Sequence, residues 1–370
     1  MTPPSEFAVV IADLGTGGAQ RVAVSLVNGL SAQGRTVTLI TLAGTASDRF
    51  STDSRVRRIA LDLVRPTHGI AAALLDNIRR LWRLRAAVRQ SGAPVVVALV
   101  GITNILTVLA CIGLPVRVVI SERNDPTQQS LGRPWDSLRR RLYRHAATVT
   151  ANSATALTAM AAYVPKAKLA LVPNAVEAPP PVIRPPHSQL RVLAVGRLSR
   201  QKAHDVLLHA FALLPASCAA WRLCIVGTGE EQESLVRIAE QHGIGERVEW
   251  RSATPEAIWD FYRDADVFVL ASRHEGTPNA LLEAMACGLP PIVSAASAGA
   301  LDCIKPGESG LVVPVQDPAA LAAALEALMT DPALRDRMGR AARLQVQATR
   351  PTSTVAVWGP VLGIPATPSA

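Results

Sequence analysis

Two glutamates, Glu275 and Glu283, stand eight positions apart and flank a Gly-Thr-Pro segment. Thr277 is a residue type that caps helix N-termini, and Pro278 suits the first helical position. The pattern therefore predicts a helix that begins between the two carboxylates and runs to about Cys287. One carboxylate is then expected in the loop before the helix, and the other one turn inside it.

The start of this helix has the properties of a phosphate site. Backbone amides in the first helical turn have no partner within the helix, and the helix dipole places positive charge there. The amides concerned belong to Asn279, Ala280 and Leu281. A carboxylate would repel a phosphate, so we expect Glu283 to bind a ribose diol and Glu275 the other end of the same ligand. A nucleotide diphosphate sugar has this layout, and helix capping or surface charge is the alternative interpretation.

The elements that must position these residues alternate between strand and helix. In the second half of the chain, a loop over 196–202 is followed by a helix that begins at His204. The predicted strands of this half are 191–195, 222–226, 247–250 and 266–271. Alternation of this kind favours an open parallel sheet, in which ligands bind beyond the carboxyl ends of the strands. We therefore expect the loops after 195 and 271 at the same edge of one sheet.

The first half repeats the pattern, with a strand, a glycine-rich turn over Gly15–Gly18 and a helix to about Gln33. Its predicted strands are 8–12, 36–42, 57–61, 95–100, 116–120, 148–151 and 169–172. The uncharged segment 93–116 is long enough to span a membrane. Its prolines, glycine and two β-branched runs instead indicate a buried strand, a helix and a second buried strand.

Composition and proline content divide the chain. Of its 370 residues, 49% are hydrophobic and 18% are charged, which is typical of globular domains. We predict an N-terminal Rossmann-like domain over 1–176, a proline-rich linker over 177–187 and a second Rossmann-like domain over 188–350. A C-terminal helix and a disordered tail are expected over 351–370. The fold class is α/β, with the two domains facing each other across a cleft.

Five sequence blocks resemble a known family. Segment 275–290 resembles the Glu-x7-Glu signature of retaining glycosyltransferases of the GT-B fold, family 4. Segment 195–202 is similar to that family's diphosphate loop, 14–21 to its N-terminal glycine loop, and 309–314 to a block near the donor site. Segment 120–126 is most similar to the branch that includes amylovoran and related surface-polysaccharide transferases.

The resemblance implies transfer of a hexose or N-acetylhexosamine from a nucleotide sugar, with UDP as the expected nucleotide, retention at the anomeric carbon, and no cofactor or metal. It implies that Arg197 and Lys202 bind the two phosphates, which suits their side-chain chemistry, and that Glu275 acts on the donor sugar. The other donor-binding residues that it indicates are Gly17, Gly18, Gly196, Thr277, Pro278, Asn279, Ala280, Leu281 and Glu283. The histidines of the sequence also form no ligand cluster.

Two positions depart from the family's pattern. The acidic residue that is usual in the glycine loop is replaced by Gln20. The loop after 120 bears, in many members, a histidine that meets the donor sugar or the acceptor, and this chain has Arg123 and Asn124 instead. Glu122, Arg123, Asn124 and Asp125 are therefore candidates for contact with the acceptor.

The net charge is +9, and much of it lies in two predicted helices, 78–89 and 139–144. Both have an apolar stripe, so Arg79, Arg80 and Arg83 are candidates for binding an anionic membrane surface or a lipid pyrophosphate, unless these are solvated helix faces. Nucleic acid is disfavoured as a partner because few aromatic residues accompany the charge. We expect a glycan or polyprenyl-diphosphate-linked acceptor.

Five cysteines without a Cys-x-x-Cys pair predict neither a disulfide framework nor a zinc site, and the N-terminus lacks the pattern of a signal peptide. The expected location is the cytoplasm, peripheral at the inner face of the membrane. Two alternatives are a nucleotide-sugar-binding protein of the same fold without transfer activity and a GT-B-fold sugar epimerase. A dehydrogenase is disfavoured because Gly15–Gly18 lacks the Gly-x-Gly-x-x-Gly spacing.

Overall fold

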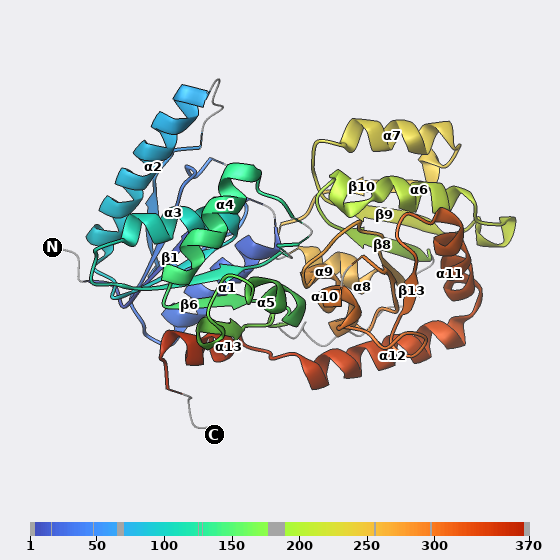
Figure 1. The fold of residues 1–370 in the computed structure, drawn as a ribbon. Coiled ribbons are helices and arrows are strands. Elements are labelled where there is room, and N and C mark those ends of the chain that lie inside the picture. The colour runs from blue at the N-terminus through green and yellow to red at the C-terminus, as the bar shows by residue number, and fades with distance from the viewer. Residues whose placement is uncertain are drawn as a thin grey trace. The chain divides into compact units, whose positions relative to one another are not determined.

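The computed structural model describes residues 4–15, 17–46, 48–64, 70–124, 126–127, 129–176, 189–254, 257–296 and 298–365. The chain divides into two compact units, shown in Figure 1. Unit 1 comprises Met1–Asn174 and Ser353–Ala370, and unit 2 comprises Ala175–Thr352. The expected linker over 177–187 lies outside the described residues, and so does most of the tail after 364.

Unit 1 is built on a seven-stranded sheet in which all paired strands are parallel. The spatial order is β3-β2-β1-β4-β5-β6-β7. The strands are β1 (Phe7–Ile11), β2 (Val37–Thr41), β3 (Arg57–Ala60), β4 (Val95–Leu99), β5 (Arg117–Glu122), β6 (Thr148–Ala151) and β7 (Leu169–Leu171). The β-branched and apolar side chains of the five inner strands are mostly buried on both faces, as is typical of a parallel sheet, whereas the edge strands β3 and β7 are partly exposed.

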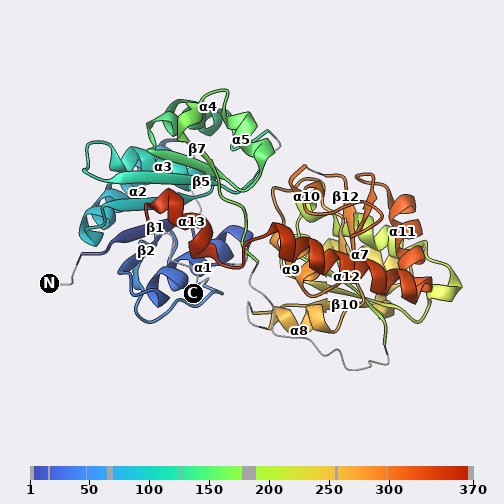
Figure 2. The ribbon, with the colours of Figure 1, turned by 90° about the horizontal axis from the view of Figure 1, so that it is seen from below.

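Helices cover both faces of this sheet. The α-helices are α1 (Gly18–Ala32), α2 (Ile70–Ser91), α3 (Gly101–Cys111), α4 (Arg133–Leu142), α5 (Ala154–Met160) and α13 (Thr354–Leu362). Helices α2, α3 and α5 contribute to the core on one face, whereas α1 and the C-terminal α13 contribute to the core on the other. Figure 2 shows α13 beside α1. The C-terminal helix of the chain therefore completes the N-terminal unit.

Unit 2 has a six-stranded parallel sheet with the order β10-β9-β8-β11-β12-β13. Its strands are β8 (Arg191–Val195), β9 (Arg222–Val226), β10 (Val248–Arg251), β11 (Val267–Leu270), β12 (Pro291–Ser294) and β13 (Leu311–Val313). Its helices are α6 (His204–Ala212), α7 (Gln232–Gln241), α8 (Ile258–Arg263), α9 (Asn279–Ala286), α10 (Ala298–Leu301), α11 (Pro318–Thr330) and α12 (Pro332–Thr349). Helices α6, α7 and α11 pack on one face, and α8, α9 and α10 on the other, while α12 contributes Met338 to the first core and Ala342 and Val346 to the second. The predicted α/β class with two Rossmann-like halves is confirmed.

The segment that could mimic a membrane span consists of β4, α3 and β5, as the sequence predicted. Within the described residues, none of the helices combines the length and the apolar character that a membrane crossing needs. The five cysteines are all free and buried.

In each sheet, the direction in which successive strands are added reverses once. In unit 2 the first strand, β8, lies between β9 and β11, and in unit 1 the first strand, β1, lies between β2 and β4. Loops that leave neighbouring strands on opposite sides of such a point diverge and leave a crevice at the carboxyl ends. The loops after β8 and β11 flank this position in unit 2, and they carry the main candidate residues.

Candidate active site

Lys202 and Glu275 lie in contact at the switch point of unit 2. Lys202 follows β8 and Glu275 follows β11, and Lys202 Nζ donates to Glu275 Oε1 at 2.5 Å. The hydroxyl of Ser272 donates to the same carboxylate oxygen at 2.7 Å. The Glu275 side chain is only 7% exposed, whereas that of Lys202 is 20% exposed. A buried carboxylate is thus held by two donors beside a cation that solvent still reaches.

Further contacts fix the two loops to each other. Arg273 pairs with Asp205, at the start of α6, through two hydrogen bonds of 3.0 and 2.6 Å. The amide of Arg273 donates to the carbonyl of Gln201, and the Gln201 side chain donates to the carbonyl of His274. Burial alone would raise the pKa of Asp205, but the bonds from Arg273 hold that pKa below its usual value. The sequence alone does not reveal this pair, because only the fold brings the two loops together.

Three glycines let these loops approach closely. A Cβ atom on Gly196 would lie about 3.2 Å from the Lys202 side chain, which packs over it. A Cβ on Gly227 would lie 1.9 Å from the carbonyl oxygen of Gly196, and one on Gly229 would lie 2.2 Å from that of Leu198. The loop after β9 therefore lies directly against the loop after β8, and a side chain at Gly227 or Gly229 would push the two apart.

Arg197 and His204 border the same loop with different exposure. The Arg197 side chain is exposed, next to Gly196. His204 is buried, and burial followed by the charge of Lys202 lowers the pKa of His204 to about 4. His204 is therefore a neutral core residue near neutral pH. The positive charge of the loop belongs to the exposed Arg197 and Arg200 and to Lys202, which is paired with Glu275.

Helix α9, which begins between the two glutamates and contains Glu283, starts one residue later than predicted. Pro278 occupies the N-cap position of α9 with ψ 116°, and Asn279 is the first helical residue. The expectation that Thr277 is the N-cap and Pro278 the first helical residue is therefore wrong, because the extended ψ of Pro278 keeps it outside the helix. Gly288 has φ +74° and ends the helix as predicted.

The first turn of α9 still contains the amides of Asn279, Ala280 and Leu281, and its positive end lies in the loop of Glu275. A Cβ on Gly299 in α10 would lie 2.4 Å from the carbonyl oxygen of Gly276, so α10 packs closely on this loop. The arrangement suits an anion next to Lys202.

Glu283 lies one turn into α9 and is bound by a residue of α8. It is buried, and the hydroxyl of Tyr262 in α8 donates to its Oε2 at 2.8 Å. Tyr262 is itself buried among aromatic neighbours, Trp259 and Phe268. The sequence offered no signal for Tyr262, which is a support that only the structure shows.

In unit 1 the glycine loop precedes α1. The amide of Gly15 and the side-chain amide of Gln20 both donate to Asp13 Oδ1, at 2.8 and 3.1 Å. A Cβ on Gly17 would lie 2.4 Å from Gln20 Oε1, so the glutamine side chain fills the space that this glycine leaves. Gly18 is the first residue of α1. Gln20 thus has a defined place in the loop, where it pairs with the carboxylate of Asp13.

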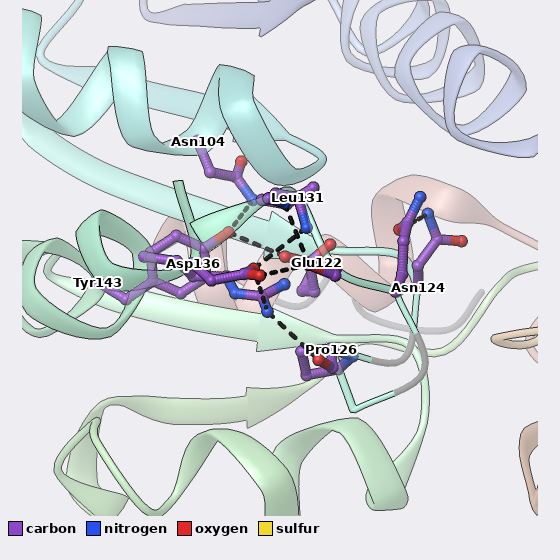
Figure 3. Close-up of polar contacts among 11 residues, drawn as sticks. Asn104, Glu122, Asn124, Pro126, Leu131, Asp136 and Tyr143 are labelled. Atoms are coloured by element: carbon purple, nitrogen blue, oxygen red, sulfur yellow. Dashed lines mark hydrogen bonds and ion pairs between the residues drawn. The ribbon is translucent and has the colours of Figure 1, made fainter. Parts of the chain in front are cut away.

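Glu122 and Arg123 lie inside unit 1. Figure 3 shows Glu122 at the end of β5, where the Tyr143 hydroxyl donates to its Oε2 at 2.8 Å. Burial raises the pKa of the Glu122 carboxyl, against the lowering effect of the Tyr143 bond. Arg123 is also buried and donates to the carbonyl of Val172 and to the side chain of Asn174. Direct contact of either residue with an acceptor, as the sequence suggested, is not supported by this placement.

Asn124 is the remaining described candidate in this loop. It is partly exposed, its Nδ2 donates to Gln129 Oε1 at 2.6 Å, and in Figure 3 it points away from the Glu122 cluster. Asp136 and Arg139 of α4 bind the loop, through the amide of Leu131 and the carbonyl of Pro126 (Figure 3). The loop is held in place, and Asn124 is its candidate for acceptor contact. Asp125 lies outside the described residues.

The three candidate arginines of α2 differ in their exposure and in their partners. Arg79 and Arg83 are exposed. Arg80 instead donates to the carbonyl of Leu63 and to the side chain of Asn77, within unit 1. The described residues contain no group of three or more His, Cys, Asp or Glu side chains that could hold a metal ion.

Comparison with known families adds an independent finding. Residues 177–345 match the model described as glycosyl transferases group 1. Residues 17–175 match the glycosyl transferase 4-like domain. Between them the two matches cover most of both units.

Two relatives are similar over nearly the whole chain. One is an uncharacterized glycosyltransferase of Haemophilus influenzae, 25% identical, with 89% of this chain and 91% of the relative covered. The other, from Campylobacter jejuni, is 27% identical over 90% of this chain and 91% of its own. It is named GalNAc-alpha-(1->4)-GalNAc-alpha-(1->3)-diNAcBac-PP-undecaprenol alpha-1,4-N-acetyl-D-galactosaminyltransferase.

Solved structures show the same fold. Sucrose-phosphate synthase from Thermosynechococcus elongatus aligns with a TM-score of 0.80 at 23% identity and covers 96% of both chains. Anabaena Alr3699/HepE in complex with UDP and glucose aligns with a TM-score of 0.78 at 16% identity, over 97% of this chain and 98% of its own.

Proposed function

The protein is a glycosyltransferase of the GT-B type, and we propose that it moves a hexose or N-acetylhexosamine from a UDP-sugar to a lipid-linked glycan. The transfer keeps the anomeric configuration and needs no metal. The reaction takes place at the cytoplasmic face of a membrane, in surface polysaccharide synthesis.

One observation carries the proposal: Lys202, Glu275 and the N-terminus of α9 meet at the switch point of unit 2. An ammonium group has three N–H donors, and Glu275 takes one of them. Lys202 can therefore hold Glu275 and donate to a phosphate oxygen at the same time. A diphosphate bound by Lys202, Arg197 and the helix amides would place its sugar at Glu275.

In the proposed reaction the bond between the anomeric carbon and the diphosphate oxygen breaks, and the acceptor hydroxyl oxygen bonds to that carbon from the same face. The hydroxyl proton passes to the leaving phosphate oxygen. Lys202, Arg197 and the α9 amides stabilise the charge on the diphosphate, at about 3 kcal/mol for each good donor in the transition state. Glu275 orients the sugar ring and stabilises the positive charge that develops on it.

The relatives support the choice of donor and acceptor. The Campylobacter jejuni enzyme is named for a substrate carried on undecaprenyl diphosphate, and the Anabaena structure holds UDP and glucose. Each matches this chain over nearly its full length.

A donor panel tests the proposal. UDP-, GDP- and ADP-sugars are incubated with the protein, EDTA and a bacterial lipid extract, and free nucleoside diphosphate is measured. We expect release from a UDP-sugar that rises with the extract and is unchanged when EDTA is replaced by Mg²⁺. Release that requires the metal would contradict metal independence. Binding of a donor without release would favour the nucleotide-sugar-binding alternative.

The stereochemistry is tested on the isolated product. NMR coupling at the new linkage is expected to show the α configuration of an α-linked donor. A β linkage would contradict retention, while leaving the donor assignment intact.

A further inference from the structure

Helix α2 exposes large apolar side chains along one face. Its inner face buries Leu84, Ala87 and Val88 in the core of unit 1. On the outer face Leu75 is 67% exposed, Ile78 44% and Trp82 71%. The spacing of i, i+3 and i+7 places these three side chains on one stripe of the helix. A tryptophan this exposed in a folded unit is an unpartnered apolar surface.

Arginines accompany this stripe. Arg79, Arg83 and Arg89 are exposed on the outer face, and the one acidic residue between 75 and 90, Asp76, is half-buried. The remaining arginines of the helix are held by the protein: Arg80 by Leu63 and Asn77, and Arg85 by the carbonyls of Ala110 and Ile112 at 2.7 Å each. The outer face is therefore both apolar and positively charged.

The α2 helix also protrudes from unit 1. Figure 1 shows α2 along the outer edge of unit 1, with its N-terminal turns extending beyond the other helices of that unit. Ile112, at the end of α3, is 57% exposed and adjoins α2 through the bond from Arg85 to its carbonyl. Apolar exposure thus continues from the helix onto its neighbour.

We propose that the outer face of α2 binds an anionic phospholipid surface, with Leu75, Ile78 and Trp82 inserted below the level of the lipid phosphates. Arg79 and Arg83 remain at that level and pair with the phosphates, while their alkyl stems extend along the apolar side chains. Tryptophan is favoured at this depth because its ring is apolar and its N–H is polar. The net charge of +9 draws the whole protein to the same surface.

This surface gives the proposed function a place to act. The membrane-binding proposal rests on the proposed function only for its biological role, because a lipid-linked acceptor is presented at the membrane. Binding to vesicles itself requires neither donor nor acceptor. The two proposals can therefore fail separately.

The test is flotation of the full-length protein with phosphatidylcholine vesicles, with and without phosphatidylglycerol. A triple variant, Leu75→Gln, Ile78→Gln and Trp82→Gln, is compared with Leu344→Gln, which alters a leucine of α12 that is 65% exposed. We expect the wild type to bind the anionic vesicles, and the triple variant to lose at least about tenfold in partitioning because its apolar insertion is removed. Leu344→Gln should bind like the wild type.

Charge is tested separately with Arg79→Gln and Arg83→Gln combined. This variant should bind anionic vesicles more weakly and with a smaller dependence on salt. Wild-type partitioning by the triple variant, or no binding of the wild type to anionic vesicles, would overturn the proposal. A wild-type dimer that the triple variant disperses in sedimentation velocity would also overturn it, because the face would then join two copies.

Discussion

The two glutamates of the candidate site, Glu275 and Glu283, have different partners. Glu275 accepts from Lys202 and Ser272, and it lies next to a cation that a diphosphate can share. Glu283 accepts from the hydroxyl of Tyr262. The sequence predicted that both carboxylates serve one ligand but could not show what orients them, because Tyr262 reaches Glu283 only through the packing of α8 on α9.

Removing the Tyr262 hydroxyl should loosen Glu283. In Tyr262→Phe the aromatic packing remains and one hydrogen bond to a carboxylate is lost, at about 1.5–3 kcal/mol. We expect the KM for the donor to rise severalfold while kcat changes less, as measured in the nucleotide-release assay.

The matched control is Tyr163→Phe. The Tyr163 hydroxyl is buried and has no hydrogen-bond partner among the described residues, so its removal should leave donor kinetics and stability unchanged. Equal donor KM values in Tyr262→Phe and the wild type would show that Glu283 does not depend on Tyr262 for its position.

His204 should make stability depend on pH. Its folded pKa of about 4 lies below the unfolded value of 6.5, so the unfolded chain binds more protons between these values. Stability therefore falls as the pH drops from 6.5 towards 4, by up to about 3 kcal/mol from this group. In His204→Gln that contribution is absent, and the melting temperature should fall less between pH 7 and pH 5. Parallel curves for the two proteins would contradict a neutral buried His204.

At the scale of elements, periodicity located most strands to within a residue or two. The strands over 191–195 and 222–226 agree with β8 and β9, because a buried parallel strand is a short continuous apolar run with clear ends. The start of α9 was displaced by one residue, since the φ of proline is compatible with the N-cap and with the first helical turn alike. The contacts between loops, such as Arg273 with Asp205, were not predictable because they join residues 68 positions apart.

The close packing of α13 on α1 depends on a glycine of α1, Gly29. A Cβ on Gly29 would lie 2.5 Å from Val355 Cγ2. By helix propensity alone Gly29→Ala would stabilise by about 1 kcal/mol. We expect it to destabilise instead, because overpacking costs about 1–3 kcal/mol and the branched valine cannot easily move aside.

The check is thermal or denaturant unfolding in two backgrounds. In Val355→Ala the space is open, so Gly29→Ala should become neutral or stabilising there. If Gly29→Ala had the same effect in both backgrounds, the close contact between α1 and α13 would not limit the packing.

At the scale of the whole molecule, the chain forms two units, each with a parallel sheet whose first strand lies between two later strands. Unit 1 is completed by the C-terminal segment. The sequence indicated the repeated αβ pattern and a division near 176. It did not show that α13 belongs to the N-terminal unit, since an apolar stripe such as Val355, Trp358 and Leu362 does not identify what it packs against. Nor did it distinguish the exposed from the engaged arginines of α2.

The central claim is that the Lys202–Glu275 pair performs transfer from a nucleotide sugar. The most direct measurement is nucleoside diphosphate release by Lys202→Ala and Glu275→Ala, beside a double control, Lys305→Ala with Glu308→Ala, which removes an exposed pair of the same charges. We expect each single variant to lose at least about tenfold in turnover, since each removes a transition-state contact, while its circular dichroism spectrum matches that of the wild type. The control should keep full turnover. Wild-type turnover in Lys202→Ala or in Glu275→Ala would contradict the claim.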